Sequence, residues 1–231
     1  MIILHENMHA EAEQVAEAIK DTYGLESRLV CEDLEQHLVP IPQFEGYHPL
    51  SRTLIEHAGE LGRAVLILTG RDLFANEESK DDDWVFGVRY DGKQIGVDVD
   101  ISVASSARMK RNDNQPSKTI EIPMDSYSRR VCTTSVHELG HSFVKGDHLK
   151  PVKVVNAKTG YTFSLGPHCP DNKCVMYEVI DIKTPCAEDS YLLMGDEPRF
   201  DAGLDETIGR MYKDWFCDAC RKSIVVDPRF R

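Results

Sequence analysis

Apolar positions alternate between helical and strand-like spacing along the first part of the chain. They recur at helical intervals in 9–23 (HAEAEQVAEAIKDTY) and in 51–61 (SRTLIEHAGEL), which predicts two amphipathic helices. Short apolar runs at 1–4 (MIIL), 27–31 (SRLVC) and 64–70 (AVLILTG) predict three strands between and around them. Strands and helices that alternate in this order favour an α/β layer with parallel strands.

A strand pair is predicted in the next part of the chain. WVFGVRY at 84–90 and IGVDVDISVAS at 95–105 are apolar runs joined through a turn that begins with Asp-Gly. One of these two strands is expected to form an antiparallel edge of the sheet, against which an extended peptide could lie.

Helical spacing returns over 125–145 (DSYSRRVCTTSVHELGHSFVK), where Asp125 or Ser126 is a possible N-cap and Gly146 a terminator. Alternating apolar positions around NAKTG predict a β-hairpin at 151–165, and a last helix is predicted near 204–215.

Length and composition limit the classes of protein to consider. The chain has 231 residues, of which 41% are apolar and 29% charged, as in a single large globular domain or two small ones. Its 39 acidic and 27 basic residues give a formal charge of −12, which argues against a nucleic-acid-binding surface. The start of the sequence has neither a basic segment nor a long apolar one, so we expect no signal peptide, no membrane span and a cytoplasmic location.

The segment HELGH at 137–141 matches the HExxH pattern of zinc hydrolases. His137 and His141 are four residues apart in a helical pattern, so both imidazoles project from one face and can bind one zinc ion. Glu138, beside the first ligand, is placed to act as a general base on a water molecule that zinc activates. The competing interpretation is a core helix with two satisfied histidines.

Two cysteine pairs follow downstream. Cys169 and Cys174 lie in HCPDNKC, and Cys217 and Cys220 form CDAC. Two such pairs are typical of a closed tetrahedral zinc site, whereas a lone CxxC would suit a redox dithiol equally well. Cys186 is a spare that could replace one of the four.

Together these motifs resemble those of the archaemetzincins, a family of compact metzincin-like zinc proteins. The similar elements are HELGH at 137–141, HCPDNKCVM at 168–176 and CDAC at 217–220. The resemblance implies a catalytic zinc on His137 and His141, with Glu138 as general base. It also implies a structural zinc on the four cysteines and makes Met176 the Met-turn residue beneath the catalytic metal. Met194 is a rival for that position.

The third ligand of the catalytic zinc stays open, because extra residues separate HELGH from HCPDNKCVM. Asp147 has the metzincin spacing but requires a glycine where Val144 stands. His148 follows Gly146 and is close in sequence. His168 directly precedes Cys169, as in the family, and is favoured. A second-shell carboxylate is expected from Asp171 or Asp181.

The remaining histidines and cysteines are given structural roles. His5, His9, His37, His48 and His57 fit no metal spacing and are expected at surfaces or helix ends. Cys31 and Cys132 are expected to be buried, inert thiols.

The sequence therefore predicts an α/β, metzincin-like zincin fold with a mixed twisted sheet, an antiparallel edge strand and an active-site helix. One catalytic domain would span 1–231, with an N-terminal α/β part (1–146) and a small zinc-bound C-terminal subdomain (147–231). The expected function is a zinc metallopeptidase with two zinc ions that acts on peptides or proteins. The alternatives are a catalytically inactive, zinc-stabilised peptide-binding protein and a thiol redox protein. Neither nucleic acid nor membrane is expected as a partner, and the oligomeric state is open.

Overall fold

The computed structural model describes residues 1–41, 46–74, 85–107, 109, 124–155, 162–177, 180–181, 200–201 and 212–230. The main sheet has five strands in the order β2-β1-β5-β7-β6. Their bounds are β1 Ile2–His5, β2 Arg28–Cys31, β5 Ala64–Thr69, β6 Gly87–Asp91 and β7 Asp100–Ser105.

The pairing confirms a mixed α/β sheet with an antiparallel edge. β1 pairs in parallel with β2 and β5, and β5 pairs in parallel with β7. β6 pairs antiparallel with β7, with Val88 opposite Val103. The connection from β6 to β7 begins at the expected Asp-Gly and contains a short 3-10 helix at Gly92–Ile95.

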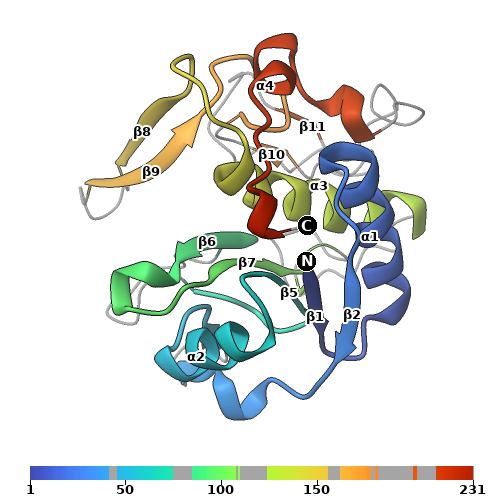
Figure 1. Cartoon of the computed structure of the whole chain (residues 1–231), viewed down its shortest axis with the longest axis vertical. Helices are drawn as coiled ribbons and strands as arrows, with labels where there is room; N and C mark the ends of the chain where they lie inside the picture. Colours follow the sequence, from blue (N-terminus) through green and yellow to red (C-terminus); the bar gives the residue numbers. More distant parts are fainter. Residues whose placement is uncertain are drawn as a thin grey trace.

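Helices cover both faces of this sheet (Figure 1). α1 (His9–Tyr23) and α3 (Met124–Phe143) pack on one face, and α2 (Arg52–Leu61) packs on the other. Successive residues of the buried strands serve opposite faces, since Leu66 belongs to the α1–α3 core and Val65 to the α2 core. Two hydrophobic cores therefore enclose the sheet, and the long helix that carries HELGH lies in the first of them.

The shorter elements lie around this layer. In chain order they are η1 Glu35–His37, β3 Val39–Ile41, β4 Gly46–His48, β8 Lys150–Val155, β9 Thr162–His168, β10 Ile180–Asp181, β11 Phe200–Asp201, η5 Tyr212–Trp215, α4 Asp218–Lys222 and η6 Pro228–Phe230. β8 and β9 form the expected antiparallel hairpin, which extends away from the main sheet (Figure 1). The NAKTG turn, most of the helix expected near 204–215, Cys186 and Met194 lie outside the described residues.

The active-site helix ends earlier than expected, at Phe143 instead of at Lys145 before the predicted terminator Gly146. The C-terminal segment takes over the hydrogen bonds there, because the Lys145 amide donates to the Ser223 carbonyl at 2.8 Å and the Val225 amide donates to the Phe143 carbonyl at 2.7 Å. Val144 also forms an antiparallel bridge with Ile224. A β-like contact with a segment far away in sequence thus ends the helix before its glycine.

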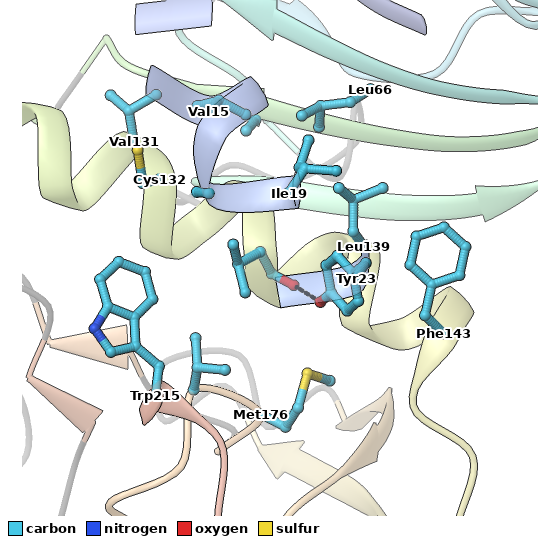
Figure 2. Packing of buried hydrophobic residues seen from close by; sticks show 14 of the residues in the cluster. Val15, Ile19, Tyr23, Leu66, Val131, Cys132, Leu139, Phe143, Met176 and Trp215 are labelled. Carbon is cyan, nitrogen blue, oxygen red and sulfur yellow. Dashed lines mark hydrogen bonds between the residues drawn. The ribbon is translucent and has the colours of Figure 1, made fainter. Parts of the chain in front are cut away.

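Side chains from α1, α3 and the C-terminal part interlock in the first core (Figure 2). The Tyr23 hydroxyl donates a 2.6 Å hydrogen bond to the Val136 carbonyl, inside this core. Cys132 is buried as expected, but Cys31 is exposed, because it ends the outermost strand β2. Among the described residues, no helix has the length and hydropathy to cross a membrane.

Candidate metal centre

Three histidines come together at the C-terminal half of α3. His137 and His141 lie on this helix, and His168 is the last residue of β9. Their ring centroids are 4.9 Å apart for His137 and His141, 5.3 Å for His137 and His168, and 4.7 Å for His141 and His168. Each offers a nitrogen to one common point, and His137 and His168 are buried.

The spacing and hydrogen bonds of these rings fit a zinc ion. The Nε2 atoms of His137 and His141 are 3.2 Å apart, close to the ~3.3 Å edge of a tetrahedron with Zn–N bonds of ~2.05 Å. Nδ1 of His137 lies 2.7 Å from the Val175 carbonyl, and Nδ1 of His168 lies 2.6 Å from the Gly166 carbonyl. A carbonyl accepts only, so Nδ1 carries the proton and Nε2 keeps a free lone pair.

The backbone carbonyls of Val175 and Gly166 therefore orient His137 and His168, a role that was expected of a carboxylate side chain. Asp171 instead accepts a hydrogen bond from the Lys173 amide in its own turn. The side chain of Asp181 lies outside the described residues.

Burial keeps the three imidazoles neutral. It lowers the pKa of His137 to about 4 and that of His141 to about 2, and it also lowers the pKa of His168. Neutral imidazole is the form that binds a metal ion, so the site is chemically ready for one at pH 7.

Glu138 lies between the helix and the edge strand β6. A Cβ placed on Gly87 would lie 2.6 Å from Oε1 of Glu138 and 2.8 Å from the Val103 carbonyl. Only glycine at this position lets the strand approach the carboxylate so closely. Without a metal ion, burial raises the pKa of Glu138 to about 8; a cation bound at the neighbouring imidazoles would lower it and favour the carboxylate that a general base requires.

Met176 packs beneath the same helix. Its side chain is fully buried, and a Cβ on Gly140 would overlap its Sδ atom. The glycine in HELGH thus allows Met176 to approach α3 closely, and its role as the Met-turn residue stays a prediction.

A second cluster brings the four cysteines together. Cys169, Cys174, Cys217 and Cys220 each offer a sulfur to a common point. Sγ of Cys169 lies 3.6 Å from Sγ of Cys217, and a tetrahedral zinc with Zn–S bonds of ~2.3 Å has an edge of ~3.8 Å. A hydrogen bond from the Cys220 thiol lowers the pKa of Cys174, which favours the thiolate form at this position.

Comparison with known proteins agrees with this architecture. In its fold, the chain resembles a zinc-dependent peptidase. That protein, from Methanocorpusculum labreanum strain Z, is 16% identical and has a TM-score of 0.56, over 96% of this chain and 98% of the other. A search of solved structures also returned an archaemetzincin from Methanopyrus kandleri, 21% identical over 76% of this chain and 79% of the other, with a TM-score of 0.47. No protein-family model and no curated protein matches the sequence. The first structural likeness confirms the fold expected from the sequence.

The two rival candidates for the third ligand lie elsewhere. Nε2 of His148 is 3.1 Å from Sγ of Cys220, so this ring contacts the cysteine cluster. Asp147 is exposed and does not belong to the histidine group. Of the three candidates, the structure brings only His168 to His137 and His141.

A further cluster was missed by the sequence analysis. Glu32, His37 and His57, assigned to no metal site above, offer ligand atoms within 4.8 Å of one another. Their spacing along the chain matches no metal motif, and they meet only because η1 folds back against α2. The sequence contained no local signal for this contact.

Proposed function

We propose that the chain is a zinc-dependent peptidase that hydrolyses peptide bonds. The observation that carries this proposal is the group of three histidines on α3 and β9 together with the Glu138 carboxylate, which lies against Gly87 of the edge strand β6. In this proposal His137, His141 and His168 hold the catalytic zinc, and Glu138 is the general base. The similarity in fold to a protein described as a zinc-dependent peptidase supports it, as do the zinc motifs of the sequence.

His137, His141 and His168 would hold a zinc ion, which would supply a Lewis acid to polarise the substrate carbonyl and activate water. Glu138 takes the proton from the attacking water and transfers it to the leaving amine nitrogen. The carbonyls of Val175 and Gly166 hold two of the rings with Nε2 toward the metal position. Met176 packs beneath Gly140 and supports α3, the helix that carries His137, Glu138 and His141.

The peptide lies along β6 in an extended conformation. β6 is last in the sheet order, and within the described residues it pairs only with β7. Its other edge can hydrogen-bond to a substrate backbone, as in strand addition. A cleft of about 520 Å³ adjoins His141 and is lined by Lys145 and Lys150, among others, which gives room for a substrate side chain.

The four cysteines hold a structural zinc in this proposal. Backbone amides donate to three of the sulfurs: Asp171 to Cys169 at 3.5 Å, Cys217 to Cys174 at 3.4 Å and Cys220 to Cys217 at 3.4 Å. Such bonds stabilise thiolates around a closed site. The cytoplasmic location and the division of the chain at 146 stay predictions.

The experiment compares wild type, Glu138→Gln and the control Glu13→Gln, which changes an exposed carboxylate on α1. Zinc content is measured by mass spectrometry, and cleavage is measured on a mixed peptide library. Glu138→Gln is expected to keep its zinc and to lose at least 100-fold in kcat, in line with the ~10²–10⁴ contribution of general base catalysis. The control should equal wild type.

Three outcomes would contradict the proposal. Unchanged turnover in Glu138→Gln would exclude the assigned base. Wild type that binds zinc and retains peptides without cleaving them would be an inactive, zinc-stabilised peptide-binding protein. A metal-free protein with a titratable dithiol would be the redox protein.

A further inference from the structure

A carboxylate and two imidazoles meet on the face of the sheet opposite α3. Glu32 follows β2, His37 ends η1, and His57 lies on α2, which packs in the second core. Nε2 of His57 lies 3.0 Å from Oε2 of Glu32, and Nε2 of His37 lies 3.9 Å from Oε1 of the same carboxylate. Both ring nitrogens therefore face one carboxylate.

One of these nitrogens has no hydrogen-bond partner among the described residues. Nε2 of His37 is buried from solvent and makes no hydrogen bond there. An unsatisfied buried polar atom is destabilising, so such atoms are rare without a reason. A ligand bound between His37 and Glu32 would satisfy it.

The backbone holds His37 in place next to His57. The His37 carbonyl accepts hydrogen bonds from the Ser51 hydroxyl and, at 3.3 Å, from the Thr53 hydroxyl. Ser51 is also the N-cap of α2, the helix that carries His57. The loop before α2 and the helix itself are thus fixed together, and the cluster does not depend on the chance position of flexible side chains.

A second, exposed carboxylate lies near the other ring nitrogen of His57. Oε2 of Glu60 lies 4.0 Å from Nδ1 of His57, on the side of the ring away from Glu32. In metal sites, the second ring nitrogen of a ligating histidine commonly faces a carboxylate or carbonyl. Without an ion, Nε2 of His57 donates its hydrogen bond to Glu32 at 3.0 Å, so an ion that binds at this nitrogen would displace its proton.

The cluster is partly exposed, most of all at Glu32. The side chains of His37, His57 and Glu32 are 17%, 18% and 30% exposed, and Nε2 of His37 itself is shielded from solvent, so an ion would enter past the Glu32 carboxylate. Glu32 also lines a cleft of about 520 Å³ that includes Glu6 and Arg71. This cleft lies at the carboxyl ends of β1, β2 and β5, where open α/β sheets usually bind ligands.

We propose that Glu32, His37 and His57 form a third metal site, for a divalent transition ion such as zinc. Two imidazoles and one carboxylate match the ligand preference of zinc and exclude calcium or magnesium as the main occupant. The rings are stacked, with centroids 4.3 Å apart and planes 5° from parallel, so their lone pairs run side by side. Ion binding requires the rings to tilt toward each other about Cβ–Cγ, a rotation that the broad χ2 preference of histidine permits.

The test compares zinc stoichiometry in the full chain across wild type, His37→Gln, His57→Gln and the control His9→Gln. His9 is 69% exposed on α1 and pairs with Glu13, so it matches an accessible histidine beside a carboxylate. Each protein is equilibrated with zinc at a fixed free concentration, and bound zinc per chain is measured after gel filtration. Circular dichroism checks that each variant is folded.

Wild type and the control are expected to hold one more zinc per chain than either cluster variant. The measured quantity is this difference in bound zinc per chain. It therefore does not depend on whether the histidine and cysteine clusters are filled. Equal stoichiometry in all four proteins, or a loss that the His9 variant shares, would overturn the third site. Should either cluster variant fail to fold, Glu32→Gln in its place must show the same loss of one zinc.

Discussion

Gly140 provides a test of the packing beneath HELGH. Replacing a glycine inside an exposed helix by alanine normally stabilises a protein by about 1 kcal/mol. Gly140 faces the interior, however, and a Cβ there would overlap Sδ of Met176 and lie 3.0 Å from its Cε and 3.3 Å from the Tyr23 hydroxyl oxygen. We therefore expect Gly140→Ala to be destabilising in the wild-type protein.

The magnitude follows from how little the neighbours can move. Met176 is fully buried and Tyr23 is nearly so, and the Tyr23 hydroxyl is already held by its hydrogen bond to α3. Overpacking in such a core costs about 1–3 kcal/mol. After the helix-propensity gain of about 1 kcal/mol, the net loss of unfolding free energy is about 0–2 kcal/mol.

A second background separates the two effects. Met176→Ala removes the overlapping atoms, and by itself it should cost about 2–5 kcal/mol as a buried Met-to-Ala change. Adding Gly140→Ala to that variant should then restore about 1 kcal/mol. The coupling between the two substitutions is therefore expected to be about 1–3 kcal/mol.

Urea unfolding of the zinc-loaded proteins measures all four free energies of the cycle, with zinc content checked in each. A Gly140→Ala change that stabilises wild type and Met176→Ala by the same amount would refute the close contact. So would a coupling energy near zero.

Three other predictions concern the same helix and its surroundings. His168→Ala should lose one zinc per chain and peptidase activity, whereas His148→Ala should keep the zinc on the histidines; bound zinc and turnover measured together will tell them apart. Tyr23→Phe should lower the unfolding free energy by about 1–2 kcal/mol in urea, because a buried carbonyl of α3 loses its donor. Asp100→Asn should cost about 1–3 kcal/mol in the same assay, since Arg89 loses its charged partner at 2.6 Å. No loss in either urea experiment would contradict the corresponding hydrogen bond.

The elements of the main layer follow from local patterns. The apolar runs of β1, β2 and β5 and the helical spacing of α1 and α2 are properties of short segments, and the structure agrees with each to within a residue or two. The order of the strands in the sheet does not follow from local patterns. β1 lies between β2 and β5, two strands that are distant from each other in sequence. Nothing in the periodicity of one segment specifies which strand becomes its neighbour.

The candidate metal centre also has a part that local spacing predicts and a part that depends on contacts between distant segments. His137 and His141 are four residues apart on one helix, so their spacing alone brings them to one face, with Glu138 on its flank. The end of that helix depends on Ile224 and its neighbours, which pair with Val144. A local signal, Gly146, suggested a longer helix, and the tertiary contact overrode it.

That same contact explains why His168, and not His148, reaches the histidine group. Because the chain leaves α3 in an extended conformation after Phe143, His148 is carried toward α4, where its ring meets Cys220. The chain then runs through β8 and β9 and returns at His168, directly before Cys169. Adjacent residues thus belong to the two clusters, and the Cys169 amide is held by the Met176 carbonyl at 2.8 Å. The cysteine cluster therefore fixes the position of His168 through the adjacent Cys169. The hairpin can then separate His168 from HELGH in sequence while His168 stays beside His137 and His141.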